Sequence, residues 1–224
     1  MKKIIYSFCI LFLFSGNIFA DNHSLSFDGD DDYVELPSGI VSNSWGEVTF
    51  ETWIYKDQKQ SYEGIISQGP QSSGGEINYN FLIWHPEANS ASPSAGQWTE
   101  AIDERYIFFS SNGISSGNFD TRHIFDNAYA LPFNEWHHIA FTFNNNTNEA
   151  KMYVDGQQFS NRNYSGQTGI QLTQDQIYFG AYGVSLGGYN NLGNIDDVRI
   201  WNTALTQEEI QSYMSTSPTG NESG

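Results

Sequence analysis

Residues 193–210 read GNIDDVRIWNTALTQEEI, a strand pattern that leads directly into the start of a helix. The alternation of apolar residues predicts a strand over 195–201. Thr206 and Glu209 have the spacing of a capping box, in which each side chain bonds the backbone N–H of the other residue. We therefore expect one helix over about 207–214, the only convincing helix pattern in the sequence.

The segment at residues 24–34, SLSFDGDDDYV, likewise joins a strand pattern to carboxylates. If this strand and the late strand are neighbours, the carboxylates of Asp28 and Asp196 converge. Calcium binds six to eight hard oxygens, and Gly29 can turn its backbone carbonyl toward such an ion. The sequence therefore predicts a structural calcium site at Asp28, Gly29 and Asp196, with Asp32 as a weaker fourth candidate.

The same aspartates also fit a plain turn, because Asp and Gly favour turns between strands. Successive side chains of a strand face opposite sides, so Asp197 is not expected to share a site with Asp196. Asp30 and Asp31 are expected to have surface or turn roles. The sequence leaves the metal site and the bare turn open as alternatives.

The first 20 residues have the pattern of a secretory signal peptide. Lys2 and Lys3 precede an apolar stretch over 4–14 that is too short to span a bilayer, and Ala20 is a small residue suited to cleavage. The single cysteine, Cys9, would leave with this signal. No disulfide and no zinc–thiolate site is therefore expected in the mature, secreted protein.

The composition predicts a β-rich domain. The chain has 224 residues, 16% aromatic side chains and 21 glycines, which is typical of many strands joined by tight turns. We expect one domain over 21–214 and a polar linker or tail over 215–224. The formal net charge of −17 disfavours binding to nucleic acid or anionic membranes. Such a charge fits a solubilised surface or one that gathers divalent cations.

Alternation with a period of two recurs along the chain and predicts a packed sandwich. Along 48–55 one face carries Val48, Phe50 and Ile54, while aromatic residues occupy the other face. The segment 139–143 alternates in the same way. Further strands are expected at 64–67, 79–84, 106–110, 151–154, 157–159 and 177–180.

Two features lie near the 139–143 strand. Asp155 and Gly156, between two strand patterns, predict a type I′ hairpin, because this turn needs two positive φ angles. Trp136 is expected to pack in the core. His137 and His138 are expected to face opposite sides of the strand, so they would not bind one ion together.

Five segments occur in an order that resembles a known family. They are SLSFDGDDDYVELP, FETWIY, EWHHIAFTF, KMYVDGQQ and GNIDDVRIWNTALTQEEI. This order resembles the LamG-like jelly-roll family, which is the laminin-G/concanavalin A-like group, in its secreted bacterial multidomain form. The resemblance covers 24–214 and is weakest over 70–123.

The resemblance implies an all-β, antiparallel jelly-roll sandwich of two curved sheets. It implies binding of glycans or proteins, often through or beside calcium, and it places a metal-ligating aspartate at Asp196. The tail resembles a junction to another such unit. We therefore expect this chain to be part of a longer protein with further domains.

Sugar-binding residues are expected outside the regular strands. Aromatic rings stack on the apolar faces of sugars, while carboxylates and amides accept hydroxyl protons. One candidate set surrounds a polar loop at Trp98, and another lies in a Gly-Tyr-Asn loop before the last strand. The predicted ligand residues are Trp98, Glu100, Asp103, Tyr106, Tyr182, Tyr189 and Asn190.

Three functions remain open from the sequence. The first is a secreted, calcium-stabilised, non-catalytic module that binds an extracellular polysaccharide or glycoprotein. The second is a structural or protein-interaction unit of an adhesive surface array. The third is a glycosidase of the laminarinase-like type, which uses two carboxylates spaced Glu-x-Asp-x-x-Glu on one strand face. The nearest string, at 100–104, has the wrong spacing and no strand alternation, so we expect no catalytic residues.

Overall fold

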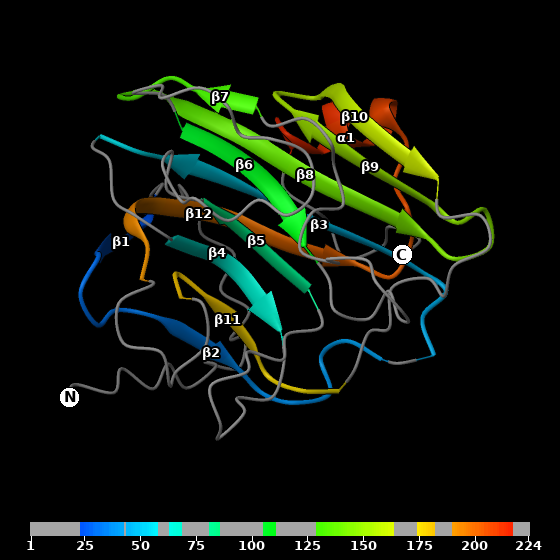
Figure 1. Ribbon diagram of the computed structural model, residues 1–224, viewed down its shortest axis with the longest axis horizontal. Helices are drawn as coiled ribbons and strands as arrows, with labels where there is room; N and C mark the ends of the chain where they lie inside the picture. Colours follow the sequence, from blue (N-terminus) through cyan, green and yellow to red (C-terminus); the bar gives the residue numbers. More distant parts are fainter. Residues whose placement is uncertain are drawn as a thin grey trace, which may run out of the picture.

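The computed structural model describes residues 23–42, 44–57, 63–68, 81–85, 105–110, 129–163, 174–181 and 190–216. Within these ranges, the strands pair into two antiparallel sheets that form the two layers of a sandwich (Figure 1). The expectation of an all-β sandwich with one short helix near the C-terminus is confirmed. No helix in the described ranges is long and apolar enough to cross a membrane.

The first sheet has six strands in the order β1-β12-β3-β8-β9-β10. They are β1 (Leu25–Asp28), β12 (Leu192–Trp201), β3 (Glu47–Tyr55), β8 (Trp136–Asn144), β9 (Glu149–Val154) and β10 (Gln157–Asn163). Among the described strands, the first is therefore hydrogen-bonded to the last, which is the condition under which the two aspartate-bearing segments were considered together.

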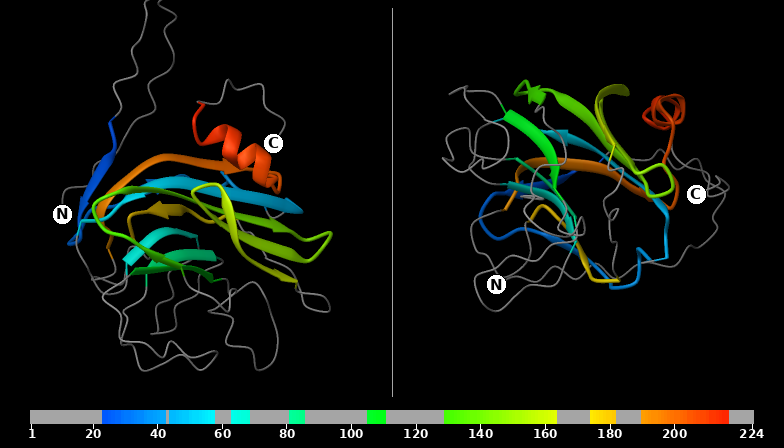
Figure 2. Two further views of the ribbon diagram at one scale, coloured as in Figure 1. Left: turned by 90° about the horizontal axis from the view of Figure 1, so that it is seen from above. Right: turned by 45° about the vertical axis from the view of Figure 1, so that its right-hand side comes forward.

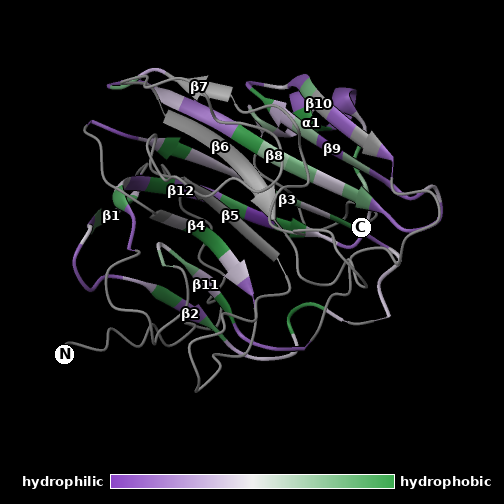
Figure 3. Ribbon diagram, in the orientation of Figure 1, coloured by the Kyte–Doolittle hydropathy of each residue, from purple (hydrophilic) through white to green (hydrophobic). Residues whose placement is uncertain are grey.

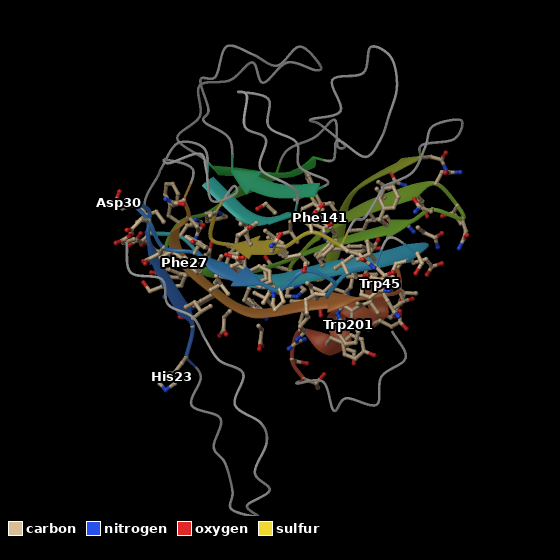
Figure 4. The ribbon with its side chains drawn as sticks, turned by 90° about the horizontal axis from the view of Figure 1, so that it is seen from below. His23, Phe27, Asp30, Trp45, Phe141 and Trp201 are labelled. Atoms are coloured by element: carbon tan, nitrogen blue, oxygen red, sulfur yellow. The ribbon has the colours of Figure 1, made fainter. Side chains whose placement is uncertain are left out.

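The second sheet has the order β2-β11-β4-β5-β6-β7. Its strands are β2 (Val34–Leu36), β11 (Ile177–Phe179), β4 (Glu63–Gln68), β5 (Phe81–His85), β6 (Arg105–Ser110) and β7 (Tyr129–Leu131). The chain crosses from the first sheet to the second through the turn between β1 and β2. That turn holds the aspartates, so the fold places them at the rim of the sandwich (Figure 4).

The core lies between the two sheets and is made of the alternating apolar residues that the sequence predicted. Phe50 and Ile54 of β3 and Phe141 of β8 are buried together with Ile66 of β4 and Phe179 of β11. Hydrophobic residues accordingly occur along strands of both sheets (Figure 3). Removing this apolar surface from water is the main driving force that holds the layers together.

The hairpin between β9 and β10 has the predicted turn. Asp155 and Gly156 have φ angles of 49° and 69°, the two positive values that a type I′ turn requires. The register shifts between Gln158 and Ser160, so a bulge follows the hairpin.

The helix α1 (Gln207–Tyr213) packs on the outer face of the first sheet, which is the face turned away from the second sheet (Figure 2). Its capping box is formed: the Thr206 N–H donates to Glu209 Oε2 at 2.7 Å, and the Glu209 N–H donates to Thr206 Oγ1 at 3.3 Å. Ile210 of the helix is buried in a small apolar cluster with Trp201 of β12.

Candidate functional site

The turn between β1 and β2 is organised by its own aspartates. The Asp30 N–H donates to Asp28 Oδ1 at 2.9 Å, and the Asp28 N–H donates to Asp32 Oδ2 at 3.2 Å. Gly29 supplies a φ of 82° between them. Short aspartate side chains bond backbone groups two residues away in this manner, which holds the chain in a turn. We refer to residues 28–32 as the acidic turn.

Three carboxylates meet in the acidic turn. Asp28, Asp31 and Asp32 each offer an oxygen, and these oxygens all lie within 4.8 Å of one another. Asp28 and Asp31 are exposed, and Asp32 is partly buried. Carboxylate oxygens at a solvent-accessible rim are the ligands that calcium prefers, and water can complete its shell. The donor set therefore fits a hard cation.

The register places Asp196 away from this cluster. Asp28 pairs with Leu192, whereas Asp196 lies four residues further along β12 and opposite Trp53 of β3. Four residues of strand span roughly 13 Å, so Asp28 and Asp196 do not converge. Asp31, which the sequence analysis assigned to a surface or turn role, stands in the cluster instead.

The aspartates of β12 have local roles. Asp196 Oδ1 accepts from the Asp197 N–H at 2.8 Å. Asp197 has a φ of 49° and contacts Arg199 Nη2 at 3.2 Å. The pairing with β3 shifts between Asp196 and Arg199. This bulge interrupts the simple alternation from which the side-chain directions were inferred.

The acidic turn is bonded to one end of the predicted Gly-Tyr-Asn loop. Asn190 Nδ2 donates to the carbonyl oxygen of Asp30. Ala181 and Asn190 pair as an isolated antiparallel bridge, and the Asn191 N–H donates to the Gly180 carbonyl at 2.7 Å. The two ends of the loop thus lie side by side, next to the acidic turn.

A buried lysine connects the residues next to the acidic turn to the first sheet. Lys56 follows β3 and is only 5% exposed. Its ammonium group donates to Asn191 Oδ1 and, at 2.8 Å, to the carbonyl oxygen of Leu192. A buried cation needs such acceptors because burial without them is costly. The bonds hold the start of β12, and with it Asn190, against the end of β3.

The structure describes no side chain for the remaining predicted ligand residues. Tyr106 belongs to β6, and its side chain is outside what the structure describes. The other five positions lie outside the described residues; they are Trp98, Glu100, Asp103, Tyr182 and Tyr189. Among the predicted ligand residues, Asn190 is therefore the one whose side-chain contact the structure gives.

Trp136 was predicted to pack in the core, and this prediction is wrong. Its side chain is 39% exposed. Trp136 pairs with Tyr55 of β3, and the two rings meet on the outer face with centroids 5.6 Å apart. Alternation correctly gave Tyr55 an outer position, and the pairing register, which is not visible in one sequence, places Trp136 beside it.

The two histidines do face opposite sides, as predicted. His137 Nδ1 lies 2.9 Å from Asp155 Oδ2 at the end of the β9–β10 hairpin. His138 is buried on the outer face, where its Nε2 lies 3.5 Å from Glu51 Oε2. They therefore do not form one metal site.

Glu51 is fully buried and lies at the centre of a set of interacting polar side chains beneath α1. Trp201 Nε1 donates to Glu51 Oε1 at 3.0 Å, and Arg199 Nη1 lies 3.5 Å from the same oxygen. Arg199 also donates to the carbonyl of Tyr213 at the end of α1. The carboxylate is therefore balanced by a cation, and the group links the helix to the sheet.

The chain belongs to the concanavalin A-like lectin/glucanases superfamily, whose family description matches residues 28–211. The resemblance drawn from five sequence segments is thereby confirmed. None of the curated protein sequences matches the chain.

Solved structures with the same fold include carbohydrate-binding domains. A candidate carbohydrate-binding protein of Bacteroides ovatus has 18% identity and a TM-score of 0.62, over 89% of this chain and 48% of the other. This chain therefore spans about half the length of that protein.

Two further similar structures contain bound sugars. The CBM40 domain of a Ruminococcus gnavus IT-sialidase, bound to α2,3-sialyllactose, has 12% identity and a TM-score of 0.54, over 80% of this chain and 97% of that domain. Domain 4 of the arabinanase AbnA from Geobacillus stearothermophilus, in complex with arabinotriose, has 15% identity and a TM-score of 0.52, over 84% and 75%. At these identities the likeness establishes the shared fold.

Proposed function

We propose that this chain is a secreted, non-catalytic module that binds an extracellular polysaccharide or glycoprotein and carries a structural calcium ion. The observation that carries the proposal is the bonded rim, where the acidic turn is held by Asn190 against both ends of the predicted ligand loop. The sugar complexes of the CBM40 and AbnA domains support a glycan as the ligand.

Calcium would be held by Asp28, Asp31 and Asp32, and the Gly29 carbonyl, a donor predicted from the sequence, would be a further ligand. Extracellular calcium modules have dissociation constants of roughly 0.1–1 mM. At free calcium about 100-fold above such a constant, binding adds about 2.7 kcal/mol of stability. The ion would stiffen the turn and, through the Asp30–Asn190 bond, the end of the adjacent loop.

A thermal melt in calcium and in a chelator tests the metal. The wild type should melt at a higher temperature in 10 mM calcium than in EDTA, and Asp31→Asn should remove this difference. Asp30→Asn is the matched control, because Asp30 lies in the same turn but contributes no carboxylate to the cluster. Asp196→Ala should keep the calcium shift, since the register holds Asp196 elsewhere. An unchanged wild-type melt would mean that the aspartates are turn formers only.

A glycan array in millimolar calcium tests the binding function. Retained glycans would support it, whereas a folded protein that binds none would favour the protein-interaction unit. Reducing-sugar release, lost on changing Glu100 or Asp103, would contradict the non-catalytic assignment. Secretion predicts that the mature chain starts near Asp21 after removal of residues 1–20, which N-terminal sequencing of the secreted protein would check.

A further inference from the structure

The helix α1 covers only one part of the outer face of the first sheet. Trp201 is buried under it with Leu205 and Ile210, and the Trp201 and Tyr213 rings stack at a centroid distance of 4.7 Å. In Figure 2 the helix lies toward the end of β12, whereas β1 pairs with the start of that strand. The outer face next to β1 thus carries side chains that α1 does not cover.

Aromatic side chains gather on this uncovered part because of the strand register. Tyr55 pairs with Trp136, and two residues earlier Trp53 pairs with His138. Residues two apart on a strand share a face, so the rings of Trp53, Tyr55 and Trp136 all lie on the outer face of the first sheet. The Tyr55 and Trp136 rings are tilted by 48° at 5.6 Å, and the Trp53 ring meets the His138 ring edge-on at 5.4 Å. We call Trp53, Tyr55 and Trp136 the aromatic platform.

The platform is partly exposed and firmly supported. Trp136 is 39% exposed, while Trp53 and Tyr55 are half-buried. Beneath them, His138 is 1% exposed and lies against Glu51. Ring positions are therefore set by the sheet and its buried polar group, and little side-chain freedom remains to be lost when a ligand binds.

Hydrogen-bonding side chains border the rings. Asn194 pairs with Tyr55 and Asp196 pairs with Trp53 across β12. Asn194 Nδ2 donates to Ser24 Oγ at 3.0 Å. The side-chain carbonyl oxygen of Asn194 takes no part in that bond. Exposed aromatic rings bordered by hydrogen-bond acceptors are the arrangement that recognises a sugar ring, with its C–H face and its surrounding hydroxyls.

We propose that the aromatic platform is a glycan-binding surface for a neutral hexopyranose unit. The C–H face of the sugar stacks on Trp136 and Tyr55, and its hydroxyls donate to Asp196 and Asn194. The charge argues for a neutral sugar. Asp196 borders the rings and the chain as a whole carries −17, so a uronate or a sulfate would be repelled. The proposal rests on the proposed glycan-binding function, but it uses a different face from the rim and needs no calcium.

The experiment is isothermal titration of the secreted chain with neutral hexose oligosaccharides, with polygalacturonate as the acidic counterpart. Trp136→Ala and Tyr55→Ala should each weaken binding roughly tenfold, a loss of about 1.4 kcal/mol, because each removes an aromatic ring that stacks on the sugar. Trp136→Tyr should restore much of the affinity, because it keeps a ring. Ile40→Ala is the matched control: Ile40 is 45% exposed and apolar, and it lies outside the platform. Binding should persist in EDTA.

The possible results separate this proposal from the proposed function. A neutral glycan that binds the wild type and Trp136→Ala equally, or that is released by EDTA, would overturn the platform and leave glycan binding by the module intact. Self-association of the wild type that Trp136→Ala abolishes, without glycan binding, would make this face an interface between copies and overturn the platform as a sugar site. A folded wild type that binds no glycan at all would overturn both.

Discussion

Gly193 lies where β12 passes close to the backbone of β3. Its φ angle is 129°, and a Cβ built there would overlap the carbonyl oxygen of Tyr55. Gly39 also has a positive φ, 87°, but a Cβ built there meets nothing within 4 Å. Alanine at residue 39 would therefore lose stability through the backbone conformation alone, whereas alanine at residue 193 would lose it through the backbone conformation and a steric overlap.

We expect Gly193→Ala to lower the free energy of unfolding by roughly 2–4 kcal/mol, because strain at a positive φ adds to displacement of the β3 backbone. Gly39→Ala should cost about 1–2 kcal/mol from the backbone conformation alone. Urea denaturation of both variants measures the two losses. If they are equal, β3 yields to the added methyl group at no cost, and the close packing of β12 on β3 does not restrict residue 193.

At the scale of elements, α1 is stabilised by its cap and by its contact with the β9–β10 hairpin. Gln211 Nε2 donates to the Gly156 carbonyl at 2.8 Å, and the Gln158 N–H donates to Gln207 Oε1 at 3.2 Å. A seven-residue helix is too short to be stable alone, so these contacts and the burial of Ile210 sustain it.

Thr206→Ala should lower the free energy of unfolding by about 1 kcal/mol, because one backbone N–H of the first turn loses its acceptor. Ser212→Ala is the control in the same helix; its carbonyl, rather than its side chain, accepts the bonds from Ser215 and Thr216. Alanine has the higher helix propensity, so this variant should be neutral or slightly more stable. Chemical denaturation followed by near-ultraviolet circular dichroism, to which the aromatic side chains of the folded protein contribute, reports both. A Thr206→Ala protein as stable as the wild type would show that the hairpin contacts and the burial of Ile210 hold the helix without the cap.

Elements with local signals were predictable from the sequence. The cap at Thr206 and Glu209 and the turn at Asp155 and Gly156 are set by residues within a few positions of one another, and the structure forms both. The inward-facing residues of β3 and β8 were equally predictable, because alternation is a local property.

Features that depend on register were not predictable. Asp196 misses Asp28 because the pairing puts Leu192, not Asp196, opposite Asp28. Trp136 lies outside the core because it pairs with Tyr55, beyond the part of the outer face that α1 covers. A pairing between strands about 80 to 165 residues apart leaves no local pattern in a single sequence, and a slip of one residue would reverse every side chain.

For the whole molecule, each sheet contains a buried tyrosine that couples stability to alkaline pH. Tyr153 of β9 is 2% exposed and Tyr178 of β11 is 6% exposed. Burial raises the pKa of both phenols above the ordinary value of 10.0. For Tyr178, Glu35 and Asp175 raise the pKa further. A phenol is neutral when protonated, so the folded state favours the protonated form.

The free energy of unfolding should therefore be insensitive to these groups below pH 10 and should fall above it. Between the ordinary pKa and the raised folded pKa, the unfolded chain has released the two protons while the folded chain retains them, so rising pH favours unfolding. Urea denaturation between pH 8 and 11 measures the slope, and the double variant Tyr153→Phe and Tyr178→Phe, which has no proton to release at either site, should show a shallower one. The comparison is between slopes, because removing two hydroxyls also changes stability at neutral pH. Equal slopes would mean that the loss of stability at alkaline pH comes from the growing negative charge of the whole acidic chain and not from these two buried phenols.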